Sequence, residues 1–306
     1  MAFLKMKELV RRSERVKSLH VHPTEPWILL SLYSGTVSIW NYESQATEKS
    51  FKVTESPVRS AKFVPSKHWI VIGSDDGYLR IYDYGTSEKV REFKAHEDFI
   101  RCVAVHPTRP CILTASDDKS VKLWDWEKDW ICCRTFEGHS HYVMHLAFSP
   151  EDNDSFASAS LDGCLKIWTI DSSIPKFNIE GHSKGVNFVE YYFSNADNKL
   201  YLLSGSDDCT AKVWDYETKS CVHTLEGHNH NVTAIFAHPE FPVVITGSED
   251  KTVRVWSKVT HSLETTLDLG LGRIWAIGYI RASKQVAFAC DEGTITAKIF
   301  NSGELD

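Results

Sequence analysis

The chain has 306 residues, of which 42% are hydrophobic and 25% are charged, and this balance is typical of a soluble globular protein. Its formal net charge of −7 gives no general attraction to nucleic acid or to an anionic membrane surface, so neither is expected as a direct partner. No apolar run approaches the length of a membrane span, and lysines interrupt the apolar start, so a signal peptide is not expected either.

The first predicted element is a strand over residues 3–11, which precedes the first of seven repeated units. Only six residues follow Phe300 at the other end of the chain, too few for an outer strand in the last unit. We therefore expect the N-terminal strand to complete that unit and close a ring, because closure removes open sheet edges.

A unit of 42 to 46 residues then recurs along the whole chain and ends each time in an aromatic residue. This interval is typical of a four-stranded propeller blade. Within a unit, alternating β-branched segments such as residues 252–256 are separated by His-Pro turns such as residues 22–26 and 106–110. The closing aromatic residues are Trp40, Tyr82, Trp124, Trp168, Trp214, Trp256 and Phe300. We predict an all-β fold, a single seven-bladed β-propeller over residues 1–306.

Two further landmarks recur in most units. A histidine precedes four of them, at His96, His139, His182 and His228, and an aspartate occupies a tight turn, at Asp76, Asp118, Asp162, Asp208 and Asp250. Together with Trp-Asp pairs such as Trp124-Asp125, these residues resemble the WD-repeat family. The resemblance implies a buried network of the histidine, a strand Ser or Thr, the turn aspartate and the tryptophan. The aspartates are then structural and not catalytic. Ser34 replaces the turn aspartate in blade 1, and blade 7 is slipped by one residue near Asp291.

The sequence gives no support for enzyme chemistry. It contains no phosphate-binding loop, nucleophile elbow or zinc-protease motif. Its eight cysteines form no C-x-x-C pair and are expected to be free thiols in a reducing compartment. Histidine pairs such as His139 and His141 fall on structural positions of the repeat. We expect no cofactor and no metal, and we interpret the chain as a binding platform.

Function should then lie where the units differ. The residue before each turn aspartate and two residues at the start of each innermost strand are expected to surround one mouth of the central channel. These positions place Arg15, Lys17 and Arg59 on blades 1 and 2, Asp98 and Asp117 on blade 3, and Asp75 at the border. Three basic residues at one side of a mouth repel one another unless an anion is present. The simpler interpretation, a solvated rim with a random mixture of signs, is the alternative.

A peptide with a terminal carboxylate and a lysine would satisfy both groups of charges, because capture of a C-terminal carboxylate is a recurrent mode of recognition. Arginine offers bidentate geometry for the carboxylate. Tyr33 and Tyr142 are expected to line the peptide. Asp75, Arg101, Asp207 and Arg273 are weaker candidates.

Several stretches resemble the N-terminal propellers of coat subunits in the COPI coatomer: residues 15–17, 22–29, 32–35, 54–59 and 136–144. The related α subunit has a histidine at the position of Tyr33, so the resemblance favours the β′ family. It implies binding of C-terminal dilysine signals, KKxx or KxKxx, on cytosolic tails of membrane cargo. Arg15, Lys17 and Arg59 would bind the carboxylate, and Asp98 and Asp117 a lysine. It also implies other coatomer subunits, α-COP among them, as partners, and a cytoplasmic location on Golgi membranes and vesicles through the coat alone.

Two other functions fit parts of the pattern. A reader of phosphopeptides would also use Arg15, Lys17, Arg59 and Arg101, although Asp98, Asp117 and Asp207 would repel a phosphate. A purely structural propeller that docks other coat subunits would bind no peptide at its mouth.

Overall fold

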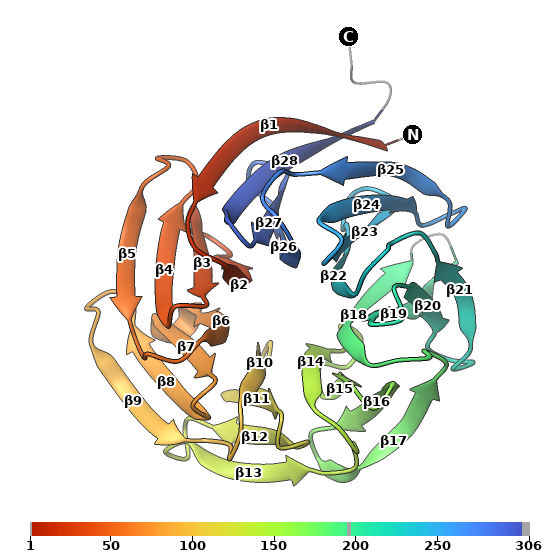
Figure 1. The fold of residues 1–306 in the computed structure, drawn as a ribbon. Coiled ribbons are helices and arrows are strands. Elements are labelled where there is room, and N and C mark those ends of the chain that lie inside the picture. The colour runs from red at the N-terminus through yellow and green to blue at the C-terminus, as the bar shows by residue number, and fades with distance from the viewer. Residues whose placement is uncertain (1, 195–196, 302–306) are drawn as a thin grey trace.

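Seven four-stranded antiparallel sheets form a ring in the computed structural model, which describes residues 2–194 and 197–301 (Figure 1). In each of the first six blades the strands follow one another in sequence from the channel outward. This confirms the predicted all-β, seven-bladed propeller. The one helical element among the described residues is a short 3-10 turn, η1 (Pro65–Lys67).

The first three blades occupy the N-terminal part of the ring. Blade 1 contains β2 (Val16–Val21), β3 (Trp27–Leu32), β4 (Thr36–Asn41) and β5 (Thr47–Lys52). Blade 2 contains β6 (Val58–Val64), β7 (Trp69–Ser74), β8 (Tyr78–Asp83) and β9 (Lys89–Lys94). Blade 3 contains β10 (Ile100–Val105), β11 (Cys111–Ser116), β12 (Val121–Asp125) and β13 (Ile131–Phe136).

The next three blades repeat this plan. Blade 4 contains β14 (Val143–Phe148), β15 (Ser155–Ser160), β16 (Cys164–Thr169) and β17 (Ser172–Glu180). Blade 5 contains β18 (Val186–Ser194), β19 (Lys199–Ser206), β20 (Ala211–Asp215) and β21 (Cys221–Leu225). Blade 6 contains β22 (Val232–Ala237), β23 (Val243–Ser248), β24 (Thr252–Ser257) and β25 (Leu263–Asp268).

Blade 7 is built from both ends of the chain. Its order is β26 (Ile274–Ile280), β27 (Gln285–Cys290), β28 (Gly293–Asn301) and then β1 (Ala2–Arg12) on the outside (Figure 1). The antiparallel register pairs Val10 with Ile295 and Arg12 with Gly293. The N-terminal strand therefore closes the ring as predicted. The side chain of Phe300, the expected closing aromatic of this blade, lies outside the described residues.

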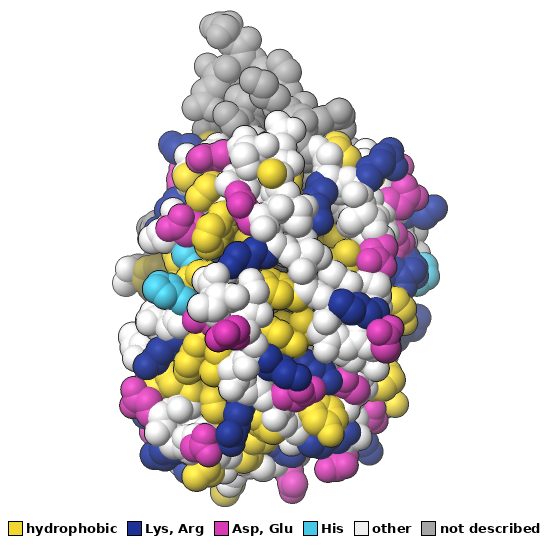
Figure 2. Space-filling model, turned by 90° about the vertical axis from the view of Figure 1, so that its left-hand side faces the viewer, with side chains coloured by type: hydrophobic (Ala, Val, Ile, Leu, Met, Phe, Trp, Pro, Cys, Tyr) yellow, Lys and Arg dark blue, Asp and Glu magenta, His cyan; other side chains and the backbone are white. Residues whose placement is uncertain are grey.

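The core lies between neighbouring blades rather than in one central mass. Phe136 of blade 3, for example, packs edge-on against Phe156 and Trp168 of blade 4, and all three side chains are at most 1% exposed. Both faces of each sheet are thus covered by adjacent sheets, which leaves the outer strands and the two ends of the channel in contact with solvent. The outer side of blades 1 and 2 carries interspersed acidic, basic and hydrophobic side chains (Figure 2).

The histidine network is present in blades 3 to 6, and blade 3 shows its geometry. Trp124 Nε1 donates to Thr114 Oγ1 at 2.9 Å, and that hydroxyl donates to His96 Nε2 at 2.6 Å. His96 Nδ1 then donates to Asp118 Oδ2 at 2.8 Å. The buried polar side chains of this network satisfy one another in this way, which explains why the residues recur as a set. These aspartates stabilise the fold, as the sequence predicted.

Asp76 of blade 2 departs from the expected set because no histidine contacts it. Thr54 precedes Asp76 by 22 residues, the same spacing that separates His96 from Asp118. Its hydroxyl donates a 2.9 Å hydrogen bond to the Asp76 carboxylate. Arg80 donates two more bonds at 2.8 and 3.1 Å, and the Ser74 hydroxyl and the Tyr78 backbone N–H donate at 2.7 and 3.1 Å. Burial alone would raise the pKa of Asp76, but the bonds from Arg80 and its other donors lower it well below the ordinary value.

Each innermost strand carries a β-bulge near its start. In blade 1 the register pairs Val16 with Leu32 and Ser18 with Ser31, which leaves Lys17 without a partner across the ladder. The same shift occurs in the other six blades. A bulge disrupts the ladder locally and turns the side chain of the extra residue in a new direction. Seven side chains are re-aimed in this way at one end of the channel.

Candidate binding site at the channel mouth

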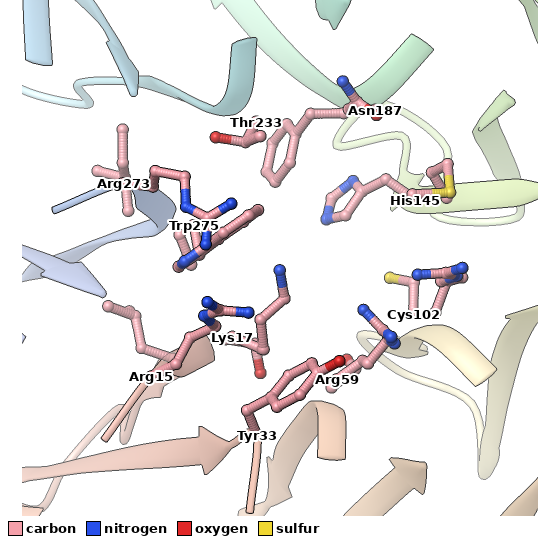
Figure 3. Close-up of a pocket in the computed structure, with 18 of the residues that line it drawn as sticks. Arg15, Lys17, Tyr33, Arg59, Cys102, His145, Asn187, Thr233, Arg273 and Trp275 are labelled. Atoms are coloured by element: carbon pink, nitrogen blue, oxygen red, sulfur yellow. The ribbon is translucent and has the colours of Figure 1, made fainter. Parts of the chain in front are cut away.

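A cavity of about 430 Å³ opens at this end of the channel (Figure 3). All seven bulged residues line it: Lys17, Arg59, Arg101, Met144, Asn187, Thr233 and Trp275. Among the described residues in its wall, six are cationic and one is a carboxylate: Arg15, Lys17, Arg59, Lys62, Arg101 and Arg273 against Glu249. The wall of the cavity is therefore strongly basic although the whole chain is acidic.

The arginines of blades 2 and 3 are each bound by an acid of their own blade. Arg59 donates from Nε and Nη2 to the two oxygens of Asp75, at 2.5 and 2.7 Å. Arg101 binds Asp117 in the same bidentate way, at 2.6 and 2.5 Å. Positive and negative groups therefore alternate around the mouth instead of forming the separate clusters that the sequence predicted.

Asp291 accepts hydrogen bonds from three different side chains. Arg15 Nε and Trp275 Nε1 both donate to Oδ1 at 2.8 Å, and Arg273 Nε donates to Oδ2 at 2.8 Å. Burial alone would raise the pKa of Asp291, but the bonds from Arg273 and Trp275 lower it. Arg273 also approaches Glu249 at 3.4 Å. Arg15 and Arg273 thus share Asp291, and Arg273 also contacts Glu249.

Lys17 has no such partner. Blade 1 has Tyr33 at the position where five other blades have an acid, and no described residue forms a hydrogen bond or ion pair with Lys17 Nζ. The nitrogen lies 3.0 Å from the ring centroid of Trp275 instead. Burial, followed by repulsion from Arg59 and Arg15, lowers the pKa of Lys17 to about 6. A bound anion would therefore stabilise the charged form of Lys17 more than that of the paired arginines at the mouth.

Aromatic rings alternate with the guanidinium groups along the rim. The ring centroid of Tyr33 lies 5.0 Å from the guanidinium carbon of Arg15 and 5.7 Å from that of Arg59. Phe99 lies 5.7 and 5.6 Å from Arg59 and Arg101. Such contacts hold the arginines in place and leave ring surface for a ligand, since Tyr33 is 41% exposed and Phe99 37%.

Tyr142 lies on the far side of Arg101, with its ring centroid 5.9 Å from the guanidinium carbon. It does not line the cavity, and neither do Asp75, Asp98, Asp117 or Asp207. Tyr142 and these acids therefore lie outside the cavity wall, which is basic.

The acids at the rim differ in how they are partnered. Asp117 is 4% exposed and already binds Arg101, whereas Asp98 is half-buried and accepts only the backbone N–H of Phe99 at 2.8 Å. Asp207 accepts a neutral side-chain amide, from Asn187 at 2.7 Å. Asp98 and Asp207 are therefore rim carboxylates without a cationic partner in the described part of the chain, and they are better placed than Asp117 to receive an ammonium group.

Below the mouth the channel continues into a second cavity of about 490 Å³, and Lys62, His145 and Phe188 line both. His145 stacks on Phe188 with the ring centroids 3.8 Å apart, and its Nδ1 donates to the carbonyl of Val189. Burial raises the pKa of Glu190, lower in the channel, to about 8. Within the described part of the chain, no three His, Cys, Asp or Glu side chains are placed to hold a metal ion.

Trp275 is the main contributor to the site that the sequence did not identify. Its position at the start of an innermost strand was clear from the repeat, but its contact with Lys17 depends on the neighbouring blade. Glu249 and Asp291 were also missed as partners of Arg273. The available signal was a spacing of 16 residues, because Arg59–Asp75, Arg101–Asp117 and Trp275–Asp291 all show it.

The profile of the WD domain, G-beta repeat family matches residues 46–83, 87–125, 130–169, 173–215 and 219–257. The chain is also 65% identical to coatomer subunit beta'-1 of Arabidopsis thaliana over 293 residues, which are 96% of the chain and 32% of that protein. It is 53% identical to a probable coatomer subunit beta' of Schizosaccharomyces pombe over 290 residues, 95% of the chain and 36% of that protein. The chain thus spans about a third of the length of these relatives. No helix among the described residues has the length and hydrophobicity needed to cross a bilayer.

Proposed function

This chain belongs to the WD domain, G-beta repeat family, and from its similarity to coatomer beta' subunits we propose that it is the propeller of a coat subunit that binds C-terminal dilysine tails. In this role it binds KKxx or KxKxx signals of membrane cargo for return from the Golgi to the endoplasmic reticulum. Other coatomer subunits, α-COP among them, are its proposed partners. The coat holds it at Golgi membranes and vesicles from the cytoplasmic side.

The observation that carries the proposal is the half-buried Lys17, which forms no ion pair with any described residue, in a mouth whose rim has acids without a cationic partner. A terminal carboxylate would bind Lys17, with Arg15 and Arg59 as flanking donors. Both arginines keep free N–H groups beyond those that bind Asp291 and Asp75. Figure 3 shows Lys17 reaching toward the middle of the cavity with Arg15 on one side and Arg59 on the other.

A lysine of the tail would place its ammonium group at Asp98, beside the carboxylate of Asp117. Tyr33, between the two basic side chains, offers its exposed ring to the aliphatic part of the peptide. Asp207 is the second unpaired acid and suits the other lysine of the signal. Partly exposed ion pairs are each worth about 0–1 kcal/mol, and an extended peptide loses conformational entropy on binding.

The complex should therefore be weak, with a Kd on the order of micromolar, or about −8 kcal/mol. Several coats on one membrane would raise the effective affinity for clustered cargo. Weak single contacts also permit release when the coat disassembles.

Calorimetric titration with an N-acetylated KKxx peptide tests the proposal. We expect micromolar binding for the free acid, at least a tenfold loss for the C-terminal amide, and a loss when each lysine is replaced by norleucine. Equal binding of acid and amide would exclude carboxylate capture. Tighter binding of a phosphorylated peptide without lysines would favour a phosphopeptide reader, and no binding of any peptide would favour a purely structural propeller.

A further inference from the structure

Lys17 is enclosed by charged groups from every neighbouring blade. The like charges of Arg59, Arg15 and Arg101 lower its pKa, and the opposite charge of Glu249 raises it by a smaller amount. Arg273 and Lys62 line the same cavity. The acids nearby are all engaged by other groups. Asp291 binds Arg15 and Arg273, and Glu249 lies against Arg273 and Asn231. Asp75 and Asp117 bind Arg59 and Arg101. His145 and Glu190 are the next titratable groups along the channel.

An arginine in this cavity cannot lose its proton, because a guanidinium remains protonated throughout the physiological range. A lysine can, and a buried ammonium beside like charges without a counterion is unfavourable. The pKa of about 6 that burial and Arg59 give to Lys17 means that its amine is largely neutral at pH 7.5. Lys17 Nζ lies 3.0 Å from the ring centroid of Trp275, and no carboxylate among the described residues forms an ion pair with it.

We propose that the mouth binds an anion together with a proton: Lys17 rests as a neutral amine and becomes an ammonium group when a peptide carboxylate enters. The proton comes from solvent, and no covalent bond changes. The inference rests on the proposed function, because the peptide carboxylate is the anion. It adds that binding takes up one carboxylate from the tail and one proton from solvent, and that the proton resides on Lys17.

The linkage has a definite sign. A bound carboxylate favours the charged lysine and raises its pKa above the value in the free protein. At pH values between the pKa of Lys17 in the free protein and its pKa in the complex, the peptide affinity should fall as pH rises, by up to tenfold per pH unit. Below about pH 6, where Lys17 of the free protein is already protonated, the affinity should become independent of this group.

Calorimetry in two buffers of different ionisation enthalpy, HEPES and Tris, measures the proton uptake directly. The probe is the N-acetylated KKxx peptide, written without His, Asp, Glu or Cys so that the peptide itself does not titrate near pH 7.5. At pH 7.5 we expect uptake of about 0.5 to 1 proton for each peptide bound. The Lys17→Arg variant carries a permanent charge and should show weaker but pH-independent binding without this uptake.

The outcomes separate the two proposals. Binding with no proton uptake in the wild-type protein would overturn the inference and leave the proposed function standing. No binding at any pH between 6 and 8 would overturn both. Rim histidines such as His141 are present in wild type and variant alike, so equal proton uptake in the two proteins would assign the proton elsewhere and also overturn the inference. Should Lys17→Arg fail to fold, Lys17→Met, which cannot take up a proton at this position, replaces it in the same buffer comparison.

Discussion

Replacement of Lys17 by methionine should stabilise the propeller. In the unfolded chain the lysine keeps its ordinary pKa of 10.5, whereas in the folded chain burial and Arg59 lower it to about 6. At pH 7 the unfolded state therefore binds a proton that the folded state largely lacks. This difference corresponds to at most about 5 kcal/mol of lost stability at 1.36 kcal/mol per pKa unit. Because the cavity opens to solvent, we expect about 1–3 kcal/mol to be recovered by methionine, which keeps the aliphatic volume.

The pH dependence of this gain is the sharper part of the prediction. Between pH 6 and 10.5 the unfolded state holds more protons, so the stability of the wild-type protein rises with pH relative to Lys17→Met. The advantage of the variant should be complete at pH 6 and should shrink steadily toward pH 10. Urea denaturation at pH 6.5, 8 and 9.5 measures it, with Lys184→Met as the control because Lys184 is exposed and has no side-chain partner among the described residues.

A gain of the same size at all three pH values would refute the reasoning, because it would arise from packing and not from a desolvated charge. The same variant should bind KKxx peptides at least tenfold more weakly, since the carboxylate loses its central cation. Stability and binding would then respond in opposite directions to one substitution. Such a trade-off is expected where a functional site is held in an unfavourable state.

Three further predictions concern the rim and the scaffold. Asp98→Asn should weaken KKxx binding at least fivefold in calorimetry. Glu97→Gln, at the adjacent exposed position, should leave the affinity unchanged. Equal losses of affinity in the two variants would exclude Asp98 as the lysine site. Asp118→Ala leaves the buried His96 without its partner and should lower stability by about 3 kcal/mol, and a loss under about 0.5 kcal/mol in urea denaturation would contradict the network's role. The pKa of Asp162 is lowered to about 2, because hydrogen bonds from its histidine and from backbone N–H groups outweigh the effect of burial. Its contribution to stability is present above pH 4 and should be lost as pH falls toward 2, so Asp162→Asn should flatten the acid limb of the unfolding curve.

The repeat was enough to predict the ring, its closure and the positions that face the mouth. Each of these depends on local sequence: the period of the unit, the turn aspartates such as Asp118, and the strand pattern of residues 3–11. The position of Lys17 at the mouth followed from the same alignment of one unit on another. The lowered pKa of its side chain did not, because it depends on desolvation and on Arg59 from an adjacent blade.

The pairing of charges was harder to foresee for a physical reason. Two arginines and two aspartates on neighbouring blades can pair within a blade or separate by sign, and composition does not decide between these arrangements. In the structure they pair within a blade, because the bulged Arg101 reaches Asp117, just beyond the end of β11 in its own sheet, within bidentate distance. The departure at Asp76 has a similar origin. Thr54 replaces the expected histidine, and Arg80 occupies the space that the smaller side chain leaves.

The seven bulges also bear on how such a propeller could change its ligand over evolutionary time. A bulged residue has no partner across the ladder, so its substitution leaves the pairing of the strands intact. Ligand choice and folding are therefore encoded by different residues of the same repeat, and selection can act on one without disturbing the other. A library randomised at these seven positions alone would sample many mouth chemistries on one scaffold. The bulges make the ring an evolvable framework as well as a rigid one.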